Sequence, residues 1–388
     1  MNAEVRKRPN WRENKTAVSV ICLVIFLAVM AIFVVPMGLA NALNTMMNTA
    51  YRLLMDTSFY IMALAVLAGA ISTLLSEYGV IELFNRILSP LMRPLYGMPG
   101  AAALGIMTTF LSDNPAILTL ADDKEYRRFF KAYQVPALTN LGTAFGMGLI
   151  VISFCLGLGN QVPHIPLAVA AGIIGVVVGS IFSTRLMLHF TAKALGREAP
   201  ACEDVGASTT VEMEHSGDTG MIRVVNALLR GGRNGVELGL SIIPGILIIC
   251  TLVMMLTNGM PEGGYTGGAY EGVEILPTVA GWLHFIIDPL FGFSDPADIA
   301  VPVTALGSAG AAMGLIPNLL ATGKAQANDV AVFTSMCMCW SGYLCTHVSM
   351  MDVLGYSRFT GKAILSHTFG GLIAGIAAHW SFVLLSLL

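Results

Sequence analysis

Long apolar runs are the feature of this chain that most limits what it can fold into. A helix of about twenty apolar residues crosses the hydrocarbon core of a bilayer. Seven runs of this kind occur: Ala17–Leu39, Ser58–Leu75, Val135–Leu158, Pro166–Leu188, Val236–Leu256, Val330–Met351 and Ala363–Leu388. Only 12% of the 388 residues are charged, about half the share of a soluble domain, and the mean hydropathy is +0.73. We therefore expect an all-α polytopic membrane protein with about seven spanning helices.

Two further apolar stretches, Ile81–Leu120 and Ile275–Leu320, are interrupted by several prolines and glycines. Interrupted stretches at corresponding places of two halves are typical of re-entrant hairpins that line a cavity. The halves also share a weak pattern, because Ser89-Pro90-Leu91 resembles Asp288-Pro289-Leu290 and a small-residue run follows each. We therefore expect two re-entrant hairpins arranged as inverted repeats.

The distribution of lysine and arginine predicts the orientation. The N-terminal head carries five of these residues, Lys124–Lys131 four and Arg185–Arg233 six, whereas 159–165 and 258–274 carry none. We place the basic segments in the cytoplasm and the last two outside, which gives the two halves opposite topology. The first apolar run is too long for a signal peptide, so we interpret it as a retained helix.

These assignments divide the chain into seven parts. They are a basic cytoplasmic head (1–16), a first transmembrane helix (17–40), a first gate-like repeat (57–158), a transmembrane helix (165–188), a cytoplasmic linker with a short amphipathic surface helix (189–235), a second gate-like repeat (236–352) and a C-terminal transmembrane helix (361–388). The linker is rich in small and acidic residues and cannot bury a core.

The best candidate binding residues lie where the first interrupted stretch turns. Ser112, Asp113 and Asn114 precede Pro115, and Thr109 stands one turn earlier. Proline frees backbone carbonyls, and short polar side chains beside it present donors and acceptors to a sugar or an amide. An N-cap role for the aspartate in a cytoplasmic turn is the alternative.

A second polar cluster precedes the sixth apolar run. Asn328 and Asp329 come directly before Val330, and Asn318 lies in the second interrupted stretch. Inverted repeats would bring both clusters to the midplane, so we expect Asp113 and Asp329 to share one site and to be linked to a coupling ion. Helix capping is the alternative for Asp329.

Four more candidates fall inside apolar runs, where polar groups are costly. Thr139, Asn140 and Ser341 are candidates for substrate binding, although close packing with polar contacts explains the first two equally well. His347 is a candidate for ion coupling through a proton, and a structural histidine is the alternative.

The alternation of hairpins and helices over residues 58–350 resembles the nucleoside-recognition or gate-domain family. That family includes the spore maturation proteins and is distantly similar to concentrative nucleoside transporters and to the membrane part of ferrous-iron transporters. In the nucleoside transporters, a Gly-x-Lys-x-x-x-Asn-Glu-Phe-Val-Ala signature supplies an acidic ligand to the ribose. Lys324, Asn328, Asp329 and Val330-Ala331 resemble it, with aspartate for glutamate and no phenylalanine. Ser112–Ala116 resembles, in polarity and position, the Gln-Thr-Glu tip of their first hairpin.

We therefore predict a secondary-active transporter of a small polar organic solute, nucleoside-like by the resemblance and coupled to sodium or protons. The alternatives are a non-transporting scaffold of the spore maturation type and a divalent metal permease. The metal alternative depends on Cys337, Cys339, Cys345 and His347. Residues two apart on a helix point away from each other, so these side chains do not form one small metal site without unwinding.

The remaining expectations concern chemistry and location. The sequence contains no nucleophile elbow, phosphate loop or His-Glu-x-x-His, so we expect no enzymatic activity, no metal site and no cofactor beyond the coupling ion. The net charge of −3 leaves no basic excess for nucleic acid. We expect a homo-oligomer in a bacterial-type inner membrane, with the N-terminus in the cytoplasm and the bilayer and a small solute as partners.

Overall fold

The structure is a computed structural model that describes residues 15–114, 116–122, 124–201 and 220–387. In this part of the chain the regular secondary structure is helical, apart from one isolated β-bridge. Residues 1–14 of the basic head, Pro115, Asp123, residues 202–219 of the predicted linker and Leu388 lie outside the described residues. Six segments are long and apolar enough to cross a membrane: Val18–Met37, Leu39–Glu77, Ala137–Gly157, Ile165–Leu195, Met221–Thr257 and Ser357–Leu385. The prediction of an all-α polytopic membrane protein is confirmed.

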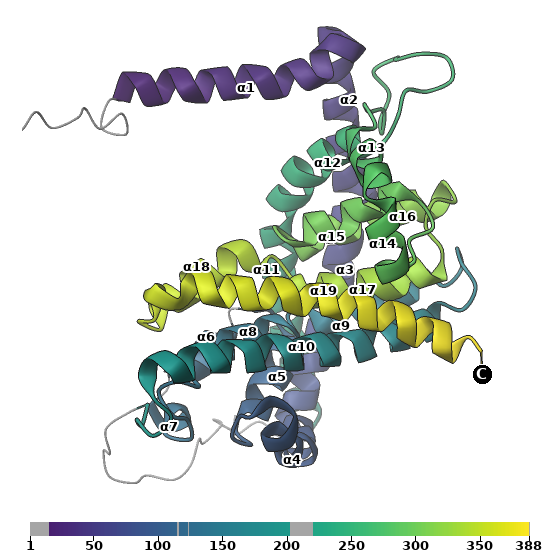
Figure 1. Ribbon diagram of the computed structural model, residues 1–388. Helices are drawn as coiled ribbons and strands as arrows, with labels where there is room; N and C mark the ends of the chain where they lie inside the picture. The colour runs from purple at the N-terminus through teal and green to yellow at the C-terminus, as the bar shows by residue number, and fades with distance from the viewer. Residues whose placement is uncertain (1–14, 115, 123, 202–219, 388) are drawn as a thin grey trace, which may run out of the picture.

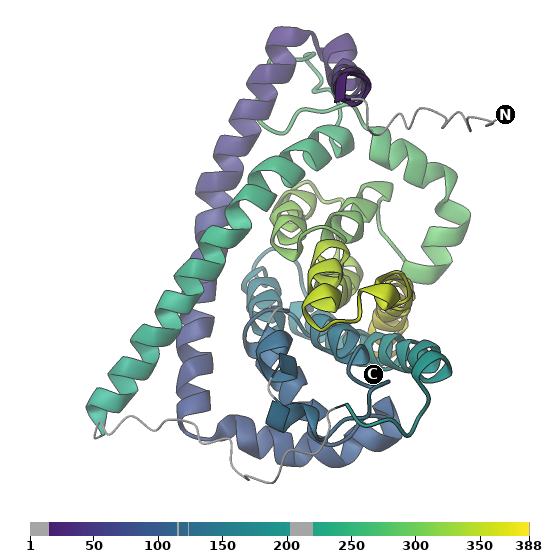
Figure 2. The same ribbon diagram turned by 90° about the vertical axis from the view of Figure 1, so that its left-hand side faces the viewer.

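Two long arms lie against each other along one side of the molecule (Figure 2). The first arm follows α1 (Lys15–Met37) and consists of α2 (Leu39–Arg52), the π-helical η2 (Leu53–Ser58) and α3 (Phe59–Glu77). The second consists of α11 (Met221–Gly245), the π-helical η4 (Ile246–Cys250) and α12 (Thr251–Thr257). The prediction of a separate surface helix over 221–234 is wrong, because this segment continues into the second arm and packs on α3.

Small residues set the close approach of the two arms. Gly231, Gly235 and Gly239 are spaced by one helical turn, and a Cβ at Gly235 would lie 2.3 Å from the carbonyl oxygen of Ala65. At the end of the seam, Glu77 accepts from Arg223 and Arg230, each at 2.7 Å. The arms therefore meet backbone to backbone, which is how small-residue stripes join helices in a bilayer.

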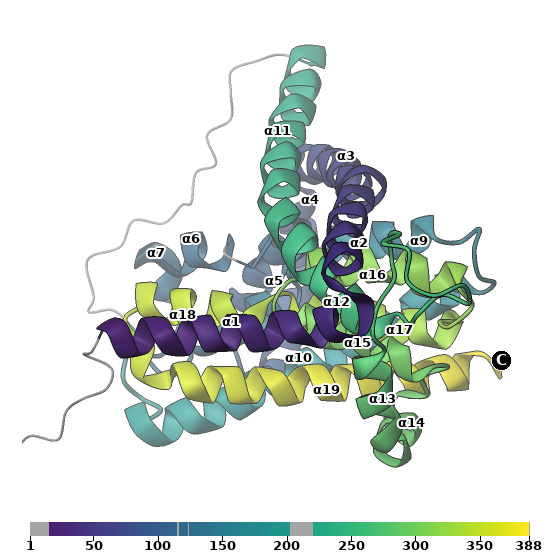
Figure 3. The ribbon, with the colours of Figure 1, turned by 90° about the horizontal axis from the view of Figure 1, so that it is seen from above.

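The core is built on α10 (Ile165–Leu195) and α19 (Thr360–Leu385), which run side by side across the direction of the arms (Figures 1 and 3). Their seam is also made of small residues, since a Cβ at Gly179 would lie 2.4 Å from the carbonyl oxygen of Gly370. Helix α17 (Ala327–Trp340) packs against both of them and is buried along its length except at Asn328.

Two short hairpins enter this core, and a broken helix follows each. The first hairpin is α5 (Ala102–Leu111) and α6 (Ala116–Asp122), and its broken helix is α8 (Ala137–Thr143) and α9 (Gly148–Gly157). The second is α15 (Ala300–Ala305) and α16 (Ala309–Ala321), followed by α17 and α18 (Tyr343–Val353). The predicted continuous span Val330–Met351 is therefore wrong, because the helix ends at Trp340 and a new one begins at Tyr343.

Both hairpins are shorter than the interrupted stretches that predicted them. The first stretch begins with a separate amphipathic helix, α4 (Val80–Leu91), and a π-helical turn, η3 (Met92–Tyr96). The second begins with α13 (Ile275–Trp282) and α14 (His284–Phe291). Three short elements, α7 (Lys124–Arg127), η5 (Pro296–Ile299) and η6 (Ser357–Phe359), complete the chain. Each half therefore follows the same order of surface helices, hairpin and broken helix, an order that fits the predicted inverted repeat.

The basic ends of several helices lie together on one side of the core. The amide of Ala132 donates to the carbonyl of Ala199 at 2.8 Å, which joins the segment after α7 to the segment after α10. The ammonium of Lys362, at the start of α19, lies 5.9 Å from the ring centre of Phe190. Two of the segments predicted from their charge to share one side of the membrane, those after α7 and after α10, are therefore neighbours.

The loop between α12 and α13 is fastened to the first arm through Glu271, which is 4% exposed. Its carboxylate accepts from the amides of Thr266, Gly267 and Gly268 at 2.9–3.2 Å and from the hydroxyls of Thr266 and Thr45. Burial raises the pKa of Glu271, but the hydrogen bonds from Thr266 and the glycine amides outweigh it and hold the pKa below its ordinary value.

We expect Glu271→Gln to lower the free energy of unfolding by about 1–3 kcal/mol at neutral pH, because an amide cannot accept from all of these donors. A carboxylate with a lowered pKa stabilises the fold above its unfolded pKa and loses this contribution as pH falls through its folded pKa. The thermal stabilities of the wild type and the variant should therefore converge on acidification. Glu262→Gln, at an exposed site of the same loop, is the control. A constant difference across pH would contradict the assignment.

Candidate functional site

Four chain segments meet inside the core: the tips of the two hairpins and the breaks of the two broken helices. The side-chain amide of Asn114, at the first tip, donates to the carbonyl of Ser341 at 2.6 Å. The amide of Gly342 donates to the carbonyl of Ala305, at the second tip, at 2.8 Å. The hydroxyl of Ser341 donates to the carbonyl of Gly146, in the first break, at 3.5 Å. We call the place where these five residues meet the crossing site.

Both breaks are made by residues in the left-handed region of backbone space. Met147 has φ 55° in the first break, and Ser341 and Gly342 have φ 38° and 72° in the second. A left-handed residue other than glycine costs roughly 1–2 kcal/mol, so the surrounding structure must hold it in place. Each break releases carbonyls and amides from the helix ladder, and these groups become available inside the core.

Asn114 is the polar centre of the crossing site. Its side chain is 1% exposed, and its Oδ1 has no hydrogen-bond partner among the described residues. Gly146 makes room for it, because a Cβ at Gly146 would lie 1.4 Å from this oxygen. A buried acceptor without a partner costs about 1–3 kcal/mol. The crossing site therefore contains an acceptor that a bound molecule could satisfy.

The second tip supplies a hydroxyl and a close backbone contact. Ser308 is the N-cap of α16, and its hydroxyl accepts from the amide of Ala311 at 3.2 Å, so the hydroxyl proton is available to another acceptor. Beside it, a Cβ at Gly342 would lie 3.0 Å from the carbonyl oxygen of Gly307. The second tip and the second break therefore form one tightly packed unit.

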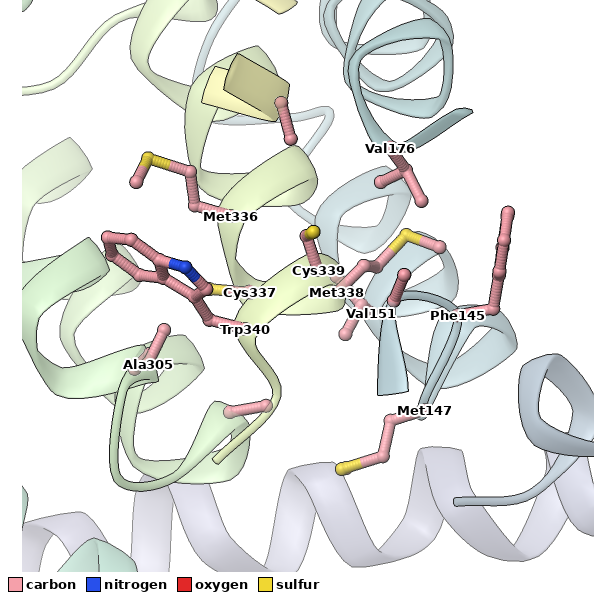
Figure 4. Packing of buried hydrophobic residues seen from close by; sticks show 14 of the residues in the cluster. Phe145, Met147, Val151, Val176, Ala305, Met336, Cys337, Met338, Cys339 and Trp340 are labelled. Atoms are coloured by element: carbon pink, nitrogen blue, oxygen red, sulfur yellow. The ribbon is translucent and has the colours of Figure 1, made fainter. Parts of the chain in front are cut away.

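Apolar and sulfur-containing side chains surround these polar groups. In Figure 4, Met147 from the first break and Ala305 from the second tip lie on either side of the last turn of α17, which ends at Trp340. Water is scarce in such surroundings, so a hydrogen bond formed here is stronger than the same bond in water.

The structure brings together some of the predicted site residues. Asn114 and Ser341 are in contact, and Asp113 adjoins them, with its carboxylate accepting from the amide of Asn114 at 2.7 Å. Ser112, at the same tip, is exposed. Thr109 lies one turn away and donates to the carbonyls of its own helix, so its hydroxyl is already satisfied.

Asn328 and Asp329 lie elsewhere. They are at the start of α17, and the helical rise of about 1.5 Å per residue places Asp329 roughly 18 Å from Ser341 at its end. Asp329 accepts from the amide and the hydroxyl of Ser294 at 3.0 and 2.6 Å and from the amide of Gln326 at 2.7 Å. The expected meeting of Asp113 and Asp329 in one site is therefore wrong, because the carboxylate of Asp329 caps its own helix.

The partners of Asn328 are equally local. Its amide group donates to the carbonyls of Phe291 and Gly292 at 3.0 and 2.7 Å, and its Oδ1 lies 2.8 Å from Nδ1 of His379. Asn318 lies on α16, where it lines a cavity of about 250 Å³ against the first arm. Neither residue reaches the crossing site.

Thr139 and Asn140 belong to a buried polar chain beside the crossing site. Asn140 donates to the hydroxyl of Ser183 at 3.0 Å, and this hydroxyl lies 2.9 Å from Nδ1 of His367. Nε2 of His367 in turn contacts the carbonyl of Cys339 at the broken end of α17. Thr139 donates to the carbonyl of Pro136 at 2.8 Å. These contacts hold helices together, as in the packing alternative.

His347 lies on α18 and has surroundings of its own. Its ring is fully buried, its centre lies 4.7 Å from that of His367, and neither of its nitrogens has a hydrogen-bond partner in the described chain. A neutral imidazole has one donor and one acceptor, so both are unsatisfied in this conformation.

Sequence reasoning missed Gly146, Ala305 and Ser308, and it missed His367 in the buried chain. Gly142 and Gly146 are one turn apart in an apolar run, a pattern that predicts a close approach without saying what approaches. Ala305 contributes only a backbone carbonyl, which no sequence pattern marks. Among the described residues, no group of three or more His, Cys, Asp and Glu side chains could hold a metal ion.

The comparisons with known proteins concern the fold. No protein-family model matches the chain, and no curated protein matches its sequence. Solved structures of CNTnw, a concentrative nucleoside transporter, match along nearly the whole chain. Its inward-facing substrate-bound state has 18% identity and a TM-score of 0.56, with 94% of this chain and 90% of that chain covered.

Two other states of CNTnw match almost as well. An outward-facing state has 14% identity and a TM-score of 0.54, covering 96% of this chain and 86% of that one. The second of three intermediate states has 15% identity and a TM-score of 0.51, covering 93% and 90%. The chain therefore has the fold of a concentrative nucleoside transporter, in agreement with the distant similarity inferred from its sequence.

Proposed function

We propose that this chain is a secondary-active transporter that binds a small polar organic solute, nucleoside-like in its hydrogen-bonding groups, at the crossing site. The observation that carries this proposal is the buried Oδ1 of Asn114, which has no hydrogen-bond partner among the described residues and lies where two hairpin tips and two helix breaks meet. A scaffold needs only packing at this place, and an apolar side chain would pack without the cost of an unsatisfied oxygen.

The groups at the crossing site fit a solute with both hydroxyls and ring or amide nitrogens. Asn114 Oδ1 would accept from a hydroxyl or an N–H group of the solute. The carboxylate of Asp113 would accept from a second hydroxyl. The similarity to CNTnw in a substrate-bound state supports this choice of solute class.

We further propose that the basic ends joined around Ala132 and Ala199 face the cytoplasm of a bacterial-type inner membrane, as the excess of positive charge indicates. The two tips would then reach the crossing site from opposite sides of the bilayer. We propose that transport is coupled to a cation, with His347 as the favoured group and protons as the favoured ion, because its imidazole is buried without a partner. We also propose that the protein forms a homo-oligomer.

A thermal-shift screen of the purified protein against nucleosides, sugars and organic acids tests the function. We expect a nucleoside-like solute to raise the melting temperature, and Asn114→Ala to weaken its binding by roughly 5- to 150-fold, equivalent to about 1–3 kcal/mol for a buried acceptor. Asn48→Ala is the matched control, because Asn48 also donates one side-chain bond to a backbone carbonyl, that of Gly267 at 2.8 Å.

The scaffold alternative makes the opposite prediction for the same screen. If no solute changes the melting temperature, and reconstituted vesicles take up none of them, the crossing site is a packing feature and the transport proposal is wrong. Equal losses for Asn114→Ala and Asn48→Ala would show that the binding site lies elsewhere.

A further inference from the structure

A large apolar cavity lies between the first arm and the core, and two of its lining residues, Phe145 and Met338, come from the segments that lead to the crossing site. Its volume is about 640 Å³, and its walls come from α3, α4, η3, α5, α9, α10, α17 and Phe145. Of the twenty residues that line it, only Tyr96 carries a side-chain oxygen or nitrogen. Helix α4 forms one wall with its apolar face, which includes Phe84 and Leu88.

The chemistry of the cavity determines what can fill it. Water in a cavity needs two to four polar partners, and this lining offers one hydroxyl, that of Tyr96, which is already bonded to the hydroxyl of Ser180 at 2.8 Å. An empty space of this size would forfeit the contacts of all its walls. Ile71, Phe84 and Leu91 are 52%, 44% and 44% exposed, so the cavity is open to the hydrocarbon around the protein.

A polar pocket of about 350 Å³ adjoins the cavity, and Tyr96 lines both. It contains two guanidinium groups, Arg185 and Arg197, with His189 and Tyr133 beside them. None of the described residues that line it is acidic. This pocket lies on α10 near its C-terminal end, on the side of the core where the basic segments gather.

Arg185 is held at the border between the pocket and the cavity. Its guanidinium donates to the carbonyls of Pro94 and Leu95, which are freed at the end of η3. Leu95 also lines the apolar cavity, so the cation sits at the rim of the apolar space. A fixed guanidinium presents its remaining N–H groups to an anion in a defined geometry.

We propose that these two spaces form one binding site for an anionic phospholipid, with the phosphate between Arg185 and Arg197 and an acyl chain in the apolar cavity. Basic pockets between membrane helices on the cytoplasmic side suit anionic headgroups. A free phosphate would use only the polar pocket and leave the apolar cavity unfilled. Phosphatidylcholine also carries a phosphate, but its own choline cation neutralises that charge, so a pocket with two arginines favours a lipid with net negative charge. None of the five residues of the crossing site lines either space, so the inference does not depend on the transport proposal.

Native mass spectrometry of the purified protein, titrated with phosphatidylglycerol or phosphatidylcholine of matched chains, tests this inference. We expect one phosphatidylglycerol to bind more tightly than phosphatidylcholine and to raise the melting temperature. Arg197→Gln should weaken phosphatidylglycerol on the order of fivefold and phosphatidylcholine less. Lys193→Gln is the charge-matched control, because Lys193 is an exposed cation in the last turn of α10 and does not line the pocket.

A second part of the experiment tests whether an acyl chain occupies the apolar cavity. Leu88→Trp fills part of the cavity and should weaken both lipids, whereas inorganic phosphate should neither stabilise the protein nor compete with phosphatidylglycerol. If Leu88→Trp does not fold, Ile106→Phe makes a smaller change in the wall formed by α5. Equal binding of the two lipids with no effect of Arg197→Gln would show ordinary bilayer contact and overturn the proposal. Full competition by inorganic phosphate would overturn it as well, in favour of an anion site without lipid.

Discussion

Gly146→Ala is expected to lower solute affinity by about a hundredfold or more. The new methyl group would stand 1.4 Å from Oδ1 of Asn114, so the asparagine must leave its place and its bond to the carbonyl of Ser341 is lost. Overpacking a core costs about 1–3 kcal/mol, and the unmade buried bond costs about as much again. Isothermal titration or thermal shift with the solute found by screening measures the loss.

A double variant separates the effect of the steric clash from the effect of the lost contact between Asn114 and the solute. Asn114→Ala in the Gly146→Ala background removes the clash, so stability should recover while solute affinity does not, and the coupling between the two sites should exceed about 0.5 kcal/mol. Gly361→Ala is the control, since it lies in α19 with no atom within 4 Å of an added Cβ. Normal affinity in Gly146→Ala would show that Asn114 does not occupy this position when solute is bound.

Proton coupling through His347 is the second large effect that we expect. Solute accumulation driven by a pH gradient should disappear in His347→Gln, while solute binding at constant pH and exchange between equal pH values should remain. The imidazole of His347 is fully buried, and its nitrogens have no hydrogen-bond partner among the described residues. They are satisfied only if a proton, a solute group or water reaches the ring during the transport cycle.

The groups around His347 define the controls. Its ring centre lies 4.7 Å from that of His367 and 5.6 Å from that of Tyr343, and His367 reaches both the carbonyl of Cys339 and the hydroxyl of Ser183. A carbonyl only accepts, so Nε2 of His367 carries the hydrogen and Nδ1 accepts from the serine. His367→Gln should therefore lower stability through loss of this cap.

The uptake assay should be run in vesicles that contain a pH-sensitive dye, with His164→Gln as the control because His164 is exposed and lies outside both proposed sites. Proton entry that accompanies solute in the wild type and is missing only in His347→Gln would support the assignment. Accumulation driven by sodium alone, with no movement of protons in the wild type, would contradict it.

Much of the membrane fold could be predicted from the sequence, because a helix that touches hydrocarbon must present apolar side chains to it. The runs that predicted α1, α10 and α19 are long and mostly apolar, and the structure has a helix long enough to cross a membrane at each of them, although α10 continues past its run to Leu195. Helix α17 could not be predicted in this way. It is enclosed by other helices rather than by lipid, so its sequence carries threonine, serine and aspartate, and its end at Trp340 is set by the packing of Gly342 on Gly307.

The candidate site was predictable only in part, for a reason that Asn114 and Asp329 illustrate. Both are polar, both lie near a proline or glycine in an apolar context, and both are buried. Asp329 satisfies its oxygens with the backbone of its own helix start and with Ser294, whereas Oδ1 of Asn114 has no partner in the described chain. Sequence identifies the residue type, but only the three-dimensional neighbours show which hydrogen-bonding group is left over.

The seam between α10 and α19 has a consequence for how the protein is made. Gly179 and Gly370 meet in the finished molecule, but the ribosome synthesises the entire second half between them. Until then α10 has neither α19 nor α17 beside it, and its glycine stripe faces lipid. The first hairpin and its broken helix lack a partner for the same reason, because Ser341, which accepts from Asn114, is synthesised 227 residues later. Insertion can therefore proceed along the chain, but closure of the core comes only after α17 and α19 have been synthesised.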